Sequence, residues 1–266
     1  MKIPECQAMK WQMKCWPVFV FCIMLSANIE SRPLLEHLNS GSFEEQIHAM
    51  YYFGYSKNKS CFWILVKNLN KTFDKEDSSP WGERFRQAAA ESLGRLGDGR
   101  AVPFLIKQYN DEKKESVKRS IIFSLGFFKD KEILPVLTDG LQSKNRDVLF
   151  ESLETAASYG DTSVVSRVKS IAGTKDDTGL SVLSSYALIR LGDESEKHAS
   201  LLRKELVNSD PSIRYWSAYC LSRTDRVEAI DDLIKALEIE NYPWVRKEME
   251  FALVMLAKKK REVEDR

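Results

Sequence analysis

Side chains suited to metal binding or proton transfer are few in this sequence. Of its three histidines, His37 and His48 lie near the start of the chain, and His198 lies in a much later helical unit. His198 is too far along the chain to share a metal ion with the other two. The chain also has no glycine-rich phosphate loop and no G-x-S-x-G motif for a nucleophilic serine. The sequence therefore predicts no catalytic residue, no metal and no cofactor.

The cysteines indicate neither a redox site nor a disulfide framework. Three of the five lie in the first 22 residues, which leaves Cys61 and Cys220 in the remainder of the chain. These two belong to the first and sixth units of the repeat described below, so we expect them to lie too far apart for a disulfide. No C-x-x-C pair suggests a zinc site. Both are predicted to be small core side chains.

Residues 1–27 have the pattern of a secretory signal peptide. Three lysines precede the uncharged run Cys15–Leu25, and Ala27 offers a small residue for a signal peptidase. The run is shorter than the ~20 residues that span a bilayer. The chain is therefore expected to be exported to the periplasm, the envelope or the medium.

Three alternatives to a cleaved signal peptide stay open. The segment could remain as an uncleaved membrane anchor, which would be the chain's one expected contact with a membrane. The true start could instead be Met9 or Met13, which would favour a cytoplasmic protein. A lipid anchor would use Cys22, although the bulky Phe21 precedes it where lipoprotein signals place a small residue.

The charge balance bears on the class of partner. The 266 residues include 40 lysines and arginines and 39 aspartates and glutamates, so the formal net charge is +1. A dedicated nucleic-acid binder usually has a strongly basic face and net charge. The composition therefore argues against a nucleic-acid partner.

The strongest pattern in the chain is a repeated helical pair. Phe85–Asp98 reads F-R-Q-A-A-A-E-S-L-G-R-L-G-D, and its apolar and small residues fall on one face of a helix. Gly97 follows the last of them, where a helix often ends with a residue at positive φ. A second apolar segment, Ala101–Tyr109, follows at once with Pro103 in its first turn. The unit is therefore two short antiparallel helices joined by a tight turn.

The repeat keeps its register along the chain. Equivalent residues recur at steps of 31–33 residues in both the first and the second helices of the pairs. One pair cannot bury its apolar face alone, so the pairs must stack. The predicted fold is all-α, an α-solenoid of stacked antiparallel helical pairs. The ladder residues are Leu93, Leu125, Ala156, Leu188, Leu221 and Leu253 in the first helices, and Leu105, Leu137, Val168, Leu201 and Leu233 in the second.

The repeat also predicts the domain organisation. Residues 28–42 form an N-terminal capping segment, residues 43–258 the solenoid, and residues 259–266 a charged tail. A polar inserted loop is expected near residues 70–82, because Phe53 and Leu93 are 40 residues apart. First helices are predicted at 42–55, 83–96, 114–128, 145–159, 178–191, 210–222 and 243–257, and second helices at 59–71, 100–109, 131–142, 163–172, 195–207 and 227–238.

Two helix starts resemble the HEAT repeat. Ser209–Arg214 (S-D-P-S-I-R) and Asn241–Arg246 (N-Y-P-W-V-R) are similar to the D-P-x-V-R start of a HEAT helix. Arg86–Asp98 and the L-I-R-L-G-D ending of Ala187–Asp193 resemble the short HEAT-like repeats first named from phycobilisome lyases. The resemblance covers roughly residues 43–258 and implies an armadillo-like superhelix.

The resemblance implies a binding scaffold rather than one chemistry. Iron-binding hydroxylases of similar fold supply metal ligands as repeated His-Glu steps, and this sequence contains no His-Glu dipeptide. No residue matches a bilin lyase site. The expected function is a non-catalytic, exported scaffold for protein partners. The alternatives are a lyase-like, chromophore-handling or other enzyme-associated HEAT-repeat protein, and a stabilising subunit of an envelope complex.

The partner surface is expected on the second helices, which are predicted to line the inner, concave face. Charged faces of helices are more often simply solvated, and aromatic residues outside the apolar stripes are better hot-spot candidates. The candidate binding residues are the charged Lys107, Asp139, Arg167, Lys169, Arg203, Lys204 and Lys235, and the aromatic Tyr109, Trp216 and Trp244, with Phe127, Phe128 and Tyr159 as further aromatic candidates.

Overall fold

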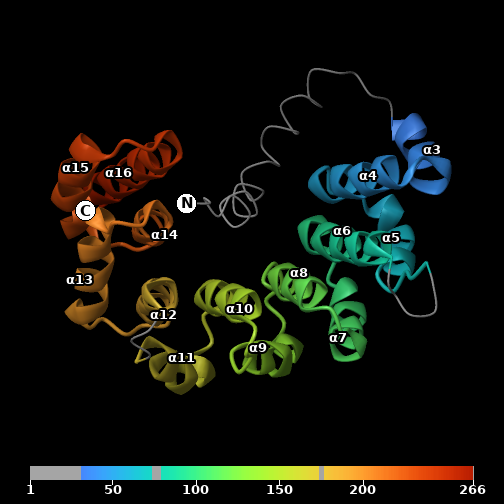
Figure 1. Cartoon of the computed structure of the whole chain (residues 1–266), viewed down its shortest axis with the longest axis horizontal. Coiled ribbons are helices and arrows are strands. Elements are labelled where there is room, and N and C mark those ends of the chain that lie inside the picture. The colour runs from blue at the N-terminus through green and yellow to red at the C-terminus, as the bar shows by residue number, and fades with distance from the viewer. Residues whose placement is uncertain (1–30, 74–78, 174–176, 266) are drawn as a thin grey trace, which may run out of the picture.

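The chain forms an arc of stacked helical pairs. The computed structural model describes residues 31–73, 79–173 and 177–265. In these ranges all regular secondary structure is helical, and the pairs follow one another along a curved row (Figure 1). The predicted α-solenoid is confirmed. The predicted signal peptide, residues 1–27, lies outside the described residues, as do residues 74–78 of the predicted inserted loop.

Two rows of helices make up the arc, and a capping helix, α3 (Ser31–Ser40), precedes them. The row of first helices contains α4 (Phe43–Tyr55), α6 (Pro80–Leu96), α8 (Glu115–Leu125), α10 (Arg146–Tyr159), α12 (Thr178–Arg190), α14 (Pro211–Leu221) and α16 (Pro243–Glu264). The row of second helices contains α5 (Phe62–Asn68), α7 (Ala101–Asp111), α9 (Leu134–Gly140), α11 (Val165–Ala172), α13 (Glu196–Lys204) and α15 (Ile230–Ile239). Short 3₁₀ turns extend most of the second helices, at Lys59–Cys61, Lys131–Ile133, Thr162–Val164, Glu205–Val207 and Val227–Ala229.

Polar caps and glycines set the ends of the first helices. The Asn145 side chain accepts hydrogen bonds from the backbone N–H groups of Asp147 and Val148 at the start of α10. At the other end of that helix Gly160 adopts φ 81°, and Gly97 does the same for α6 with φ 68°. Glycine takes this left-handed conformation at little cost, so the chain can turn at once into the second helix.

The ladder residues form the centre of the core. Leu93, Leu125, Ala156, Leu188 and Leu221 are all buried, and so are Leu105, Leu137, Val168 and Leu233 in the second helices. One residue of each row departs from this pattern. Leu253 in the first row and Leu201 in the second are only partly buried. Cys61 and Cys220 are buried and free, in two different pairs. The register read from the sequence is therefore the register of the packed core.

The two rows of helices lie on opposite sides of the arc. Figure 1 shows α4 to α14 of the first row lining the inner side, with α5 to α13 of the second row outside them. The prediction that second helices line the concave face is therefore wrong.

Small residues explain why the first helices are inside. A Cβ atom added to Gly54 on α4 would lie 2.7 Å from the Cα of Ser92 on α6. A Cβ on Gly94 of α6 would likewise lie 2.7 Å from the Cα of Ser124 on α8. Helices whose backbones approach this closely occupy the shorter side of a curved row, and the second helices lie along the longer side.

A buried arginine clamp ties the two helices of a pair to the loops beside them. Arg86 of α6 donates from Nε to Glu112 Oε2 at 2.8 Å and from Nη1 to the carbonyl oxygen of Lys71 at 3.0 Å. Glu112 Oε1 also accepts the backbone N–H of Lys114 at 3.0 Å. Both side chains are almost fully buried. The clamp therefore joins the loop before α6 to the loop after α7.

The same clamp recurs in the D-P-S-I-R segment. Arg214 of α14 donates to Glu240 Oε2 at 2.5 Å and to the carbonyl oxygen of Asn208 at 2.7 Å. Glu240 accepts the backbone N–H of Tyr242 at 2.9 Å. Arg214, the arginine through which this segment resembles a HEAT repeat, therefore stabilises the fold.

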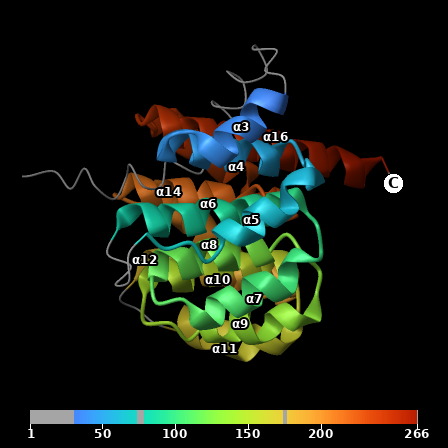
Figure 2. The same cartoon turned by 90° about the vertical axis from the view of Figure 1, so that its right-hand side faces the viewer.

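Two boundaries differ from the sequence expectation. Helix α6 begins at Pro80 because the Ser79 side chain caps it, so the irregular segment ends before residue 82. Helix α16 continues to Glu264 and projects beyond the stack (Figure 2). No glycine or proline interrupts its last turns, and Lys258–Glu262 and Lys260–Glu264 form ion pairs one turn apart. Residues 259–264 are therefore helix rather than a separate tail.

Candidate functional site

The inner face of the arc carries two lines of side chains in register with the ladder. They lie two residues before and two residues after Phe53 of α4 and each ladder position from Leu93 to Leu221. We call them the inner lines. The first contains Tyr51, Glu91, Phe123, Glu154, Tyr186 and Tyr219, and the second contains Tyr55, Arg95, Phe127, Ser158, Arg190 and Arg223.

Contacts between non-adjacent helices place these lines on the concave side. Tyr219 of α14 donates its hydroxyl hydrogen to Glu154 Oε1 of α10 at 2.5 Å, which bridges the intervening α12. Arg95 of α6 touches aromatic rings on both neighbours, α4 and α8. Side chains of flanking helices can meet over a middle helix only on the side toward which the row bends.

An arginine among aromatic rings occupies the N-terminal half of this face. The guanidinium carbon of Arg95 lies 4.6 Å from the ring centroid of Tyr55, 4.8 Å from that of Phe123 and 5.9 Å from that of Phe127. Phe123 and Phe127 pack edge to face at 5.2 Å. The Phe127 ring is 48% exposed. We call Tyr55, Arg95, Phe123 and Phe127 the inner aromatic platform.

The hydrogen-bonding capacity of Arg95 is unused within the described residues. Its Nε is buried without a hydrogen-bond partner, and its nearest carboxylate oxygen, on Glu91, is 4.0 Å away. Glu91 accepts the hydroxyl of Ser120 at 3.0 Å, and burial, followed by this carboxylate, raises the pKa of Tyr51. Arg95 therefore offers a cation and oriented donors, whereas the charge of Glu91 is engaged by its own neighbours.

The C-terminal half of the inner face is closed by its own side chains. The Arg223 guanidinium lies 3.5 Å above the Tyr219 ring, and its Nη1 is 3.6 Å from Glu248 Oε1 on α16. Burial, and next the Glu154 carboxylate, raise the pKa of Tyr219, so its phenol remains a donor. Burial also raises the pKa of Tyr186, to about 12. We call Glu154, Tyr219, Arg223 and Glu248 the closed bridge.

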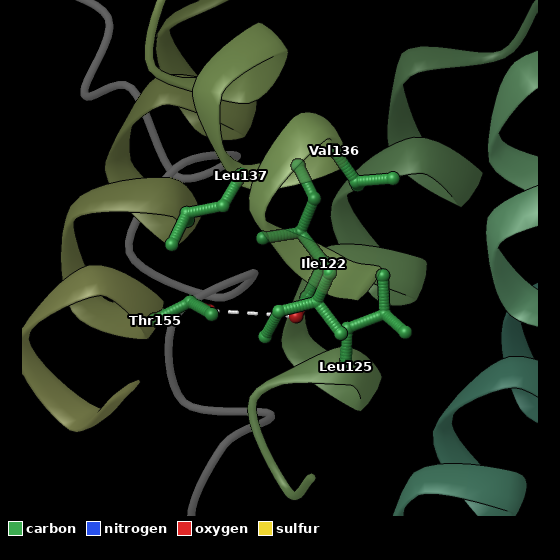
Figure 3. A pocket seen from close by; sticks show the side chains of 6 residues that line it. Ile122, Leu125, Val136, Leu137 and Thr155 are labelled. Carbon is green, nitrogen blue, oxygen red and sulfur yellow. Dashed lines mark hydrogen bonds between the residues drawn. The ribbon is translucent and has the colours of Figure 1, made fainter. Parts of the chain in front are cut away.

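A small hollow between α8, α9 and α10 offers no ligand site. Figure 3 shows apolar side chains around it, with Thr155 donating its hydroxyl hydrogen to the carbonyl oxygen of Ile122 at 3.4 Å. Every polar group drawn there already has a partner, so nothing remains to orient a bound molecule.

The described ranges show neither a metal-binding cluster nor a membrane-spanning helix. Residues 31–73, 79–173 and 177–265 contain no group of three or more His, Cys, Asp or Glu side chains that could hold a metal ion. No helix within them has the length and apolar character needed to cross a membrane.

The charged residues predicted to bind a partner lie on the outer row and mostly serve their own chain. Asp139 accepts the hydroxyl of Tyr109 at 2.8 Å, and Arg167 donates to the carbonyl oxygen of Leu141 at 2.9 Å. Lys169 pairs with Asp193 at 2.9 Å. Arg203 pairs with Glu196, Glu228 and Asp232, Lys204 pairs with Glu205, and Lys107 and Lys235 are exposed on α7 and α15.

Most of the aromatic residues predicted to bind a partner are also packed within the chain itself. Tyr109 and Trp216 are buried, because Tyr109 links α7 to α9 and Trp216 packs on Phe150 at 4.8 Å. Phe128 is buried, and Tyr159 and Trp244 are partly buried. Phe127 alone of these candidates belongs to the inner aromatic platform.

Tyr55, Arg95 and Phe123 were not singled out from the sequence. The signal that could have found them is the register, since each lies two residues from a ladder position or its equivalent Phe53.

Comparisons with known proteins agree with this architecture. A family model described as HEAT repeats matches residues 31–125 and residues 102–188. The solved complex of CpcE and CpcF of phycocyanin lyase from Nostoc sp. PCC7120 is similar over 87% of this chain and 96% of that chain, with 20% identity and a TM-score of 0.65. At 20% identity, this structural similarity shows a shared fold and no more.

Two further solved structures match with lower TM-scores. Escherichia coli YibA matches over 88% of this chain and 84% of that chain, with 15% identity and a TM-score of 0.48. Human deoxyhypusine hydroxylase matches over 86% and 84%, with 16% identity and a TM-score of 0.37. No curated protein matches the sequence.

Proposed function

This chain belongs to the HEAT-repeat family, and we propose that it is a protein-binding scaffold whose partner docks on the inner aromatic platform. HEAT repeats generally mediate protein interactions, and solenoids present extended concave surfaces for this purpose. The single observation that carries the proposal is Arg95, which lies between aromatic rings with a buried Nε that no described group accepts from.

The platform has the composition of a binding hot spot. Arginine and aromatic side chains dominate such sites, and the surrounding contacts exclude water from them. The 48% exposed Phe127 ring supplies apolar area, and Arg95 supplies donors for a carboxylate or a backbone carbonyl oxygen of the partner. The partner segment is therefore one that presents an apolar side chain next to an acidic side chain or a free carbonyl group.

We propose binding rather than catalysis, because the sequence has no G-x-S-x-G motif for a nucleophilic serine, no glycine-rich phosphate loop and no repeated His-Glu metal-ligand motif. The alternative is a lyase-like or chromophore-handling role, because the chain shares its fold with the phycocyanin lyase complex. An absorption spectrum of the protein purified from its own host distinguishes the two, since a stoichiometric chromophore would favour the alternative. Turnover of a substrate by the purified chain would also overturn the scaffold proposal.

Capture with matched variants tests the scaffold. The full chain, Phe127→Ala, Arg95→Ala and the outer-face control Lys235→Ala would each be used as bait with chemical crosslinking. The proposal expects one protein to be captured stoichiometrically by the wild type and the control, lost from the two platform variants, and crosslinked near α6 and α8. Equal capture by all four baits would show that the platform is not the docking surface.

Export is proposed from the leader sequence alone. The lysines before Cys15–Leu25 and the small Ala27 support a signal peptide that directs the scaffold to the envelope or the medium. Mass spectrometry of the native N-terminus tests this. A mature chain beginning near Asn28 supports export, and an intact Met1 with the protein in the cytosol contradicts it.

A further inference from the structure

An exposed indole lies on the outer face of the first two helical pairs. Trp63 of α5 is 62% exposed, more than any other aromatic side chain of the described residues. Its ring packs edge to face on Phe104 of α7 at 5.9 Å and on Phe62 at 5.0 Å. The contact with Phe104 holds the indole against α7, so it is a fixed feature of the surface. The inner aromatic platform does not include it.

Lysines surround this indole. Residues 57–71 contain Lys57, Lys59, Lys67 and Lys71 and no acidic residue. Lys59 and Lys67 lie one helical turn before and after Trp63, and Lys107 lies one turn after Phe104, so all three border the two rings. We call Trp63, Phe104, Lys59, Lys67 and Lys107 the outer tryptophan patch.

Among the described residues, few carboxylates lie near these lysines. Asp98 pairs with Arg100 at 2.7 Å and also attracts Lys59, and Glu112 is taken up by the buried clamp with Arg86. Asp111, one turn after Lys107, is the other acid on this part of the outer row. In the described residues no ion pair engages Lys59, Lys67 or Lys107. The patch therefore combines one exposed apolar ring with a local excess of positive charge.

We propose that the outer tryptophan patch binds the surface of a lipid bilayer that contains anionic phospholipids. An indole at the head-group level with lysines beside it is the usual composition of a membrane interface, and each lysine near an anionic surface adds attraction. The long lysine side chains can reach the phosphate groups while the indole enters the boundary of the acyl region.

A protein partner fits this patch less well. Lysine is depleted from the buried centres of protein interfaces, and a standard interface buries about 800 Å² on each side. Here the exposed apolar surface is essentially one indole with the edge of Phe104. Helices α5 and α7, which carry the patch, also lie in the outer row of the arc (Figure 1), the side that a broad bilayer surface can approach.

The α15 helix provides a matched control on the same outer row. Ile234 is 45% exposed and lies next to Lys235, but Asp231, Asp232 and Glu238 share this short helix. An exposed apolar side chain and a lysine are therefore present in a locally acidic setting. If exposure of an apolar group alone caused vesicle binding, Ile234→Ser would weaken it as much as Trp63→Ser.

Vesicle binding by the full chain tests the proposal. Cosedimentation would compare vesicles of phosphatidylcholine with vesicles of phosphatidylcholine and phosphatidylglycerol, for wild type, Trp63→Ser, Lys59→Gln/Lys67→Gln and the control Ile234→Ser. We expect binding of the wild type and control to the anionic vesicles, weakened about tenfold or more in the other two variants and reduced by salt. The apolar run Cys15–Leu25 is present in every protein, so its contribution is common to all.

A second measurement reports on the indole itself. Brominated lipids quench tryptophan residues that enter the acyl boundary, and Trp63→Phe keeps a ring at the position while removing the fluorophore. Both proteins would also carry Trp11→Phe and Trp16→Phe, because Trp16 lies in the apolar run Cys15–Leu25 and could itself be quenched. We expect the quenching seen with Trp63 present to be largely absent in the Trp63→Phe variant. Equal quenching in both proteins, or binding that neither the lysine nor the Trp63→Ser substitutions change, would overturn the proposal. Binding to an acidic protein in place of vesicles would also overturn it.

Discussion

The two halves of the inner face have the same scaffold and opposite surfaces. In the N-terminal half Arg95 lies among three rings with unused donors, and Phe127 is exposed. In the C-terminal half Arg223 occupies the equivalent position, but it covers Tyr219 and faces Glu248. The difference shows that the same position of a repeat can either serve the fold or remain available to a partner.

The reach of one side chain accounts for the difference. Tyr219 extends over α12 to Glu154, so the concave surface of α10 to α14 is spanned by a hydrogen bond of 2.5 Å. In the N-terminal half the corresponding positions are Tyr51, Glu91 and Phe123. Of these only Tyr51 has a hydroxyl, and it interacts with Glu91 on the adjacent helix α6 rather than across a middle helix. Within the described residues, the Phe127 ring of this half remains 48% exposed.

The clamps are the feature that both halves share, and breaking them should give the largest effect. Arg86→Ala leaves Glu112 as a buried, unpaired carboxylate, so we expect a loss of about 3–5 kcal/mol in the free energy of unfolding. Arg214→Ala should cost a similar amount through Glu240. Urea unfolding followed by circular dichroism measures both.

Arg246 is the control for the clamps. It occupies the equivalent position of α16, but it donates only to the carbonyl oxygens of Leu237 and Glu240. Arg246→Ala should therefore cost only about 1 kcal/mol. A loss as large as that of Arg86→Ala would mean that the buried carboxylate is not the cause.

The next largest effect separates binding from stability. Phe127→Ala removes an exposed ring of the platform, so we expect a loss of at least about 2 kcal/mol in partner affinity, or about thirtyfold. The free energy of unfolding should change little, because the ring is half in solvent. Titration calorimetry with the captured partner and urea unfolding measure the two quantities. A loss of stability without a loss of affinity would show that Phe127 supports the fold and does not bind the partner.

Sequence reasoning recovered the scaffold better than the surface. The register of Leu93, Leu125 and Leu188 was readable because burial imposes a fixed period on the apolar residues. The inner side was mistaken because both rows of helices have an apolar stripe and charged remaining positions. The curvature depends on contacts such as that of Gly54 with Ser92, which join helices of different pairs.

The surface clusters needed coordinates for the same reason. Arg95 and Trp63 are ordinary members of helical segments in the sequence. The first becomes notable because Tyr55 and Phe123 come to it from α4 and α8, and the second because it remains exposed beside Phe104. Neither juxtaposition follows from spacing within one helix.

Substitutions in the closed bridge should lower stability and leave partner affinity unchanged, which is the opposite of what we expect for the platform. Tyr219→Phe removes the hydroxyl that donates to Glu154 and leaves that partly buried carboxylate without this donor. We expect the free energy of unfolding to fall by about 1–3 kcal/mol, with unchanged affinity for the partner. Reduced affinity in Tyr219→Phe at unchanged stability would show that the C-terminal half also binds.

The smallest effect concerns Glu248, the acid at the end of the closed bridge. Burial raises the pKa of its carboxyl group, and the opposing influence of Arg223 does not compensate for it. The folded state therefore holds this proton more tightly than the unfolded state does. Ionised Glu248 is unfavourable to folding above the raised folded pKa, and this penalty disappears below the unfolded value of about 4.3.

Glu248→Gln should consequently stabilise the protein by about 0.5–1 kcal/mol at neutral pH, and the gain should vanish as the pH falls below about 4. Glu112→Gln should instead destabilise the protein at neutral pH. Burial opposes the charge of Glu112, but the backbone N–H of Lys114 and the Arg86 guanidinium outweigh it and lower its pKa, so the charged form supports folding above the unfolded value. Urea unfolding of both variants across this pH range measures the two signs. A loss of stability in Glu248→Gln at neutral pH would show that its pairing with Arg223 outweighs its burial, and the bridge would then resemble the clamps.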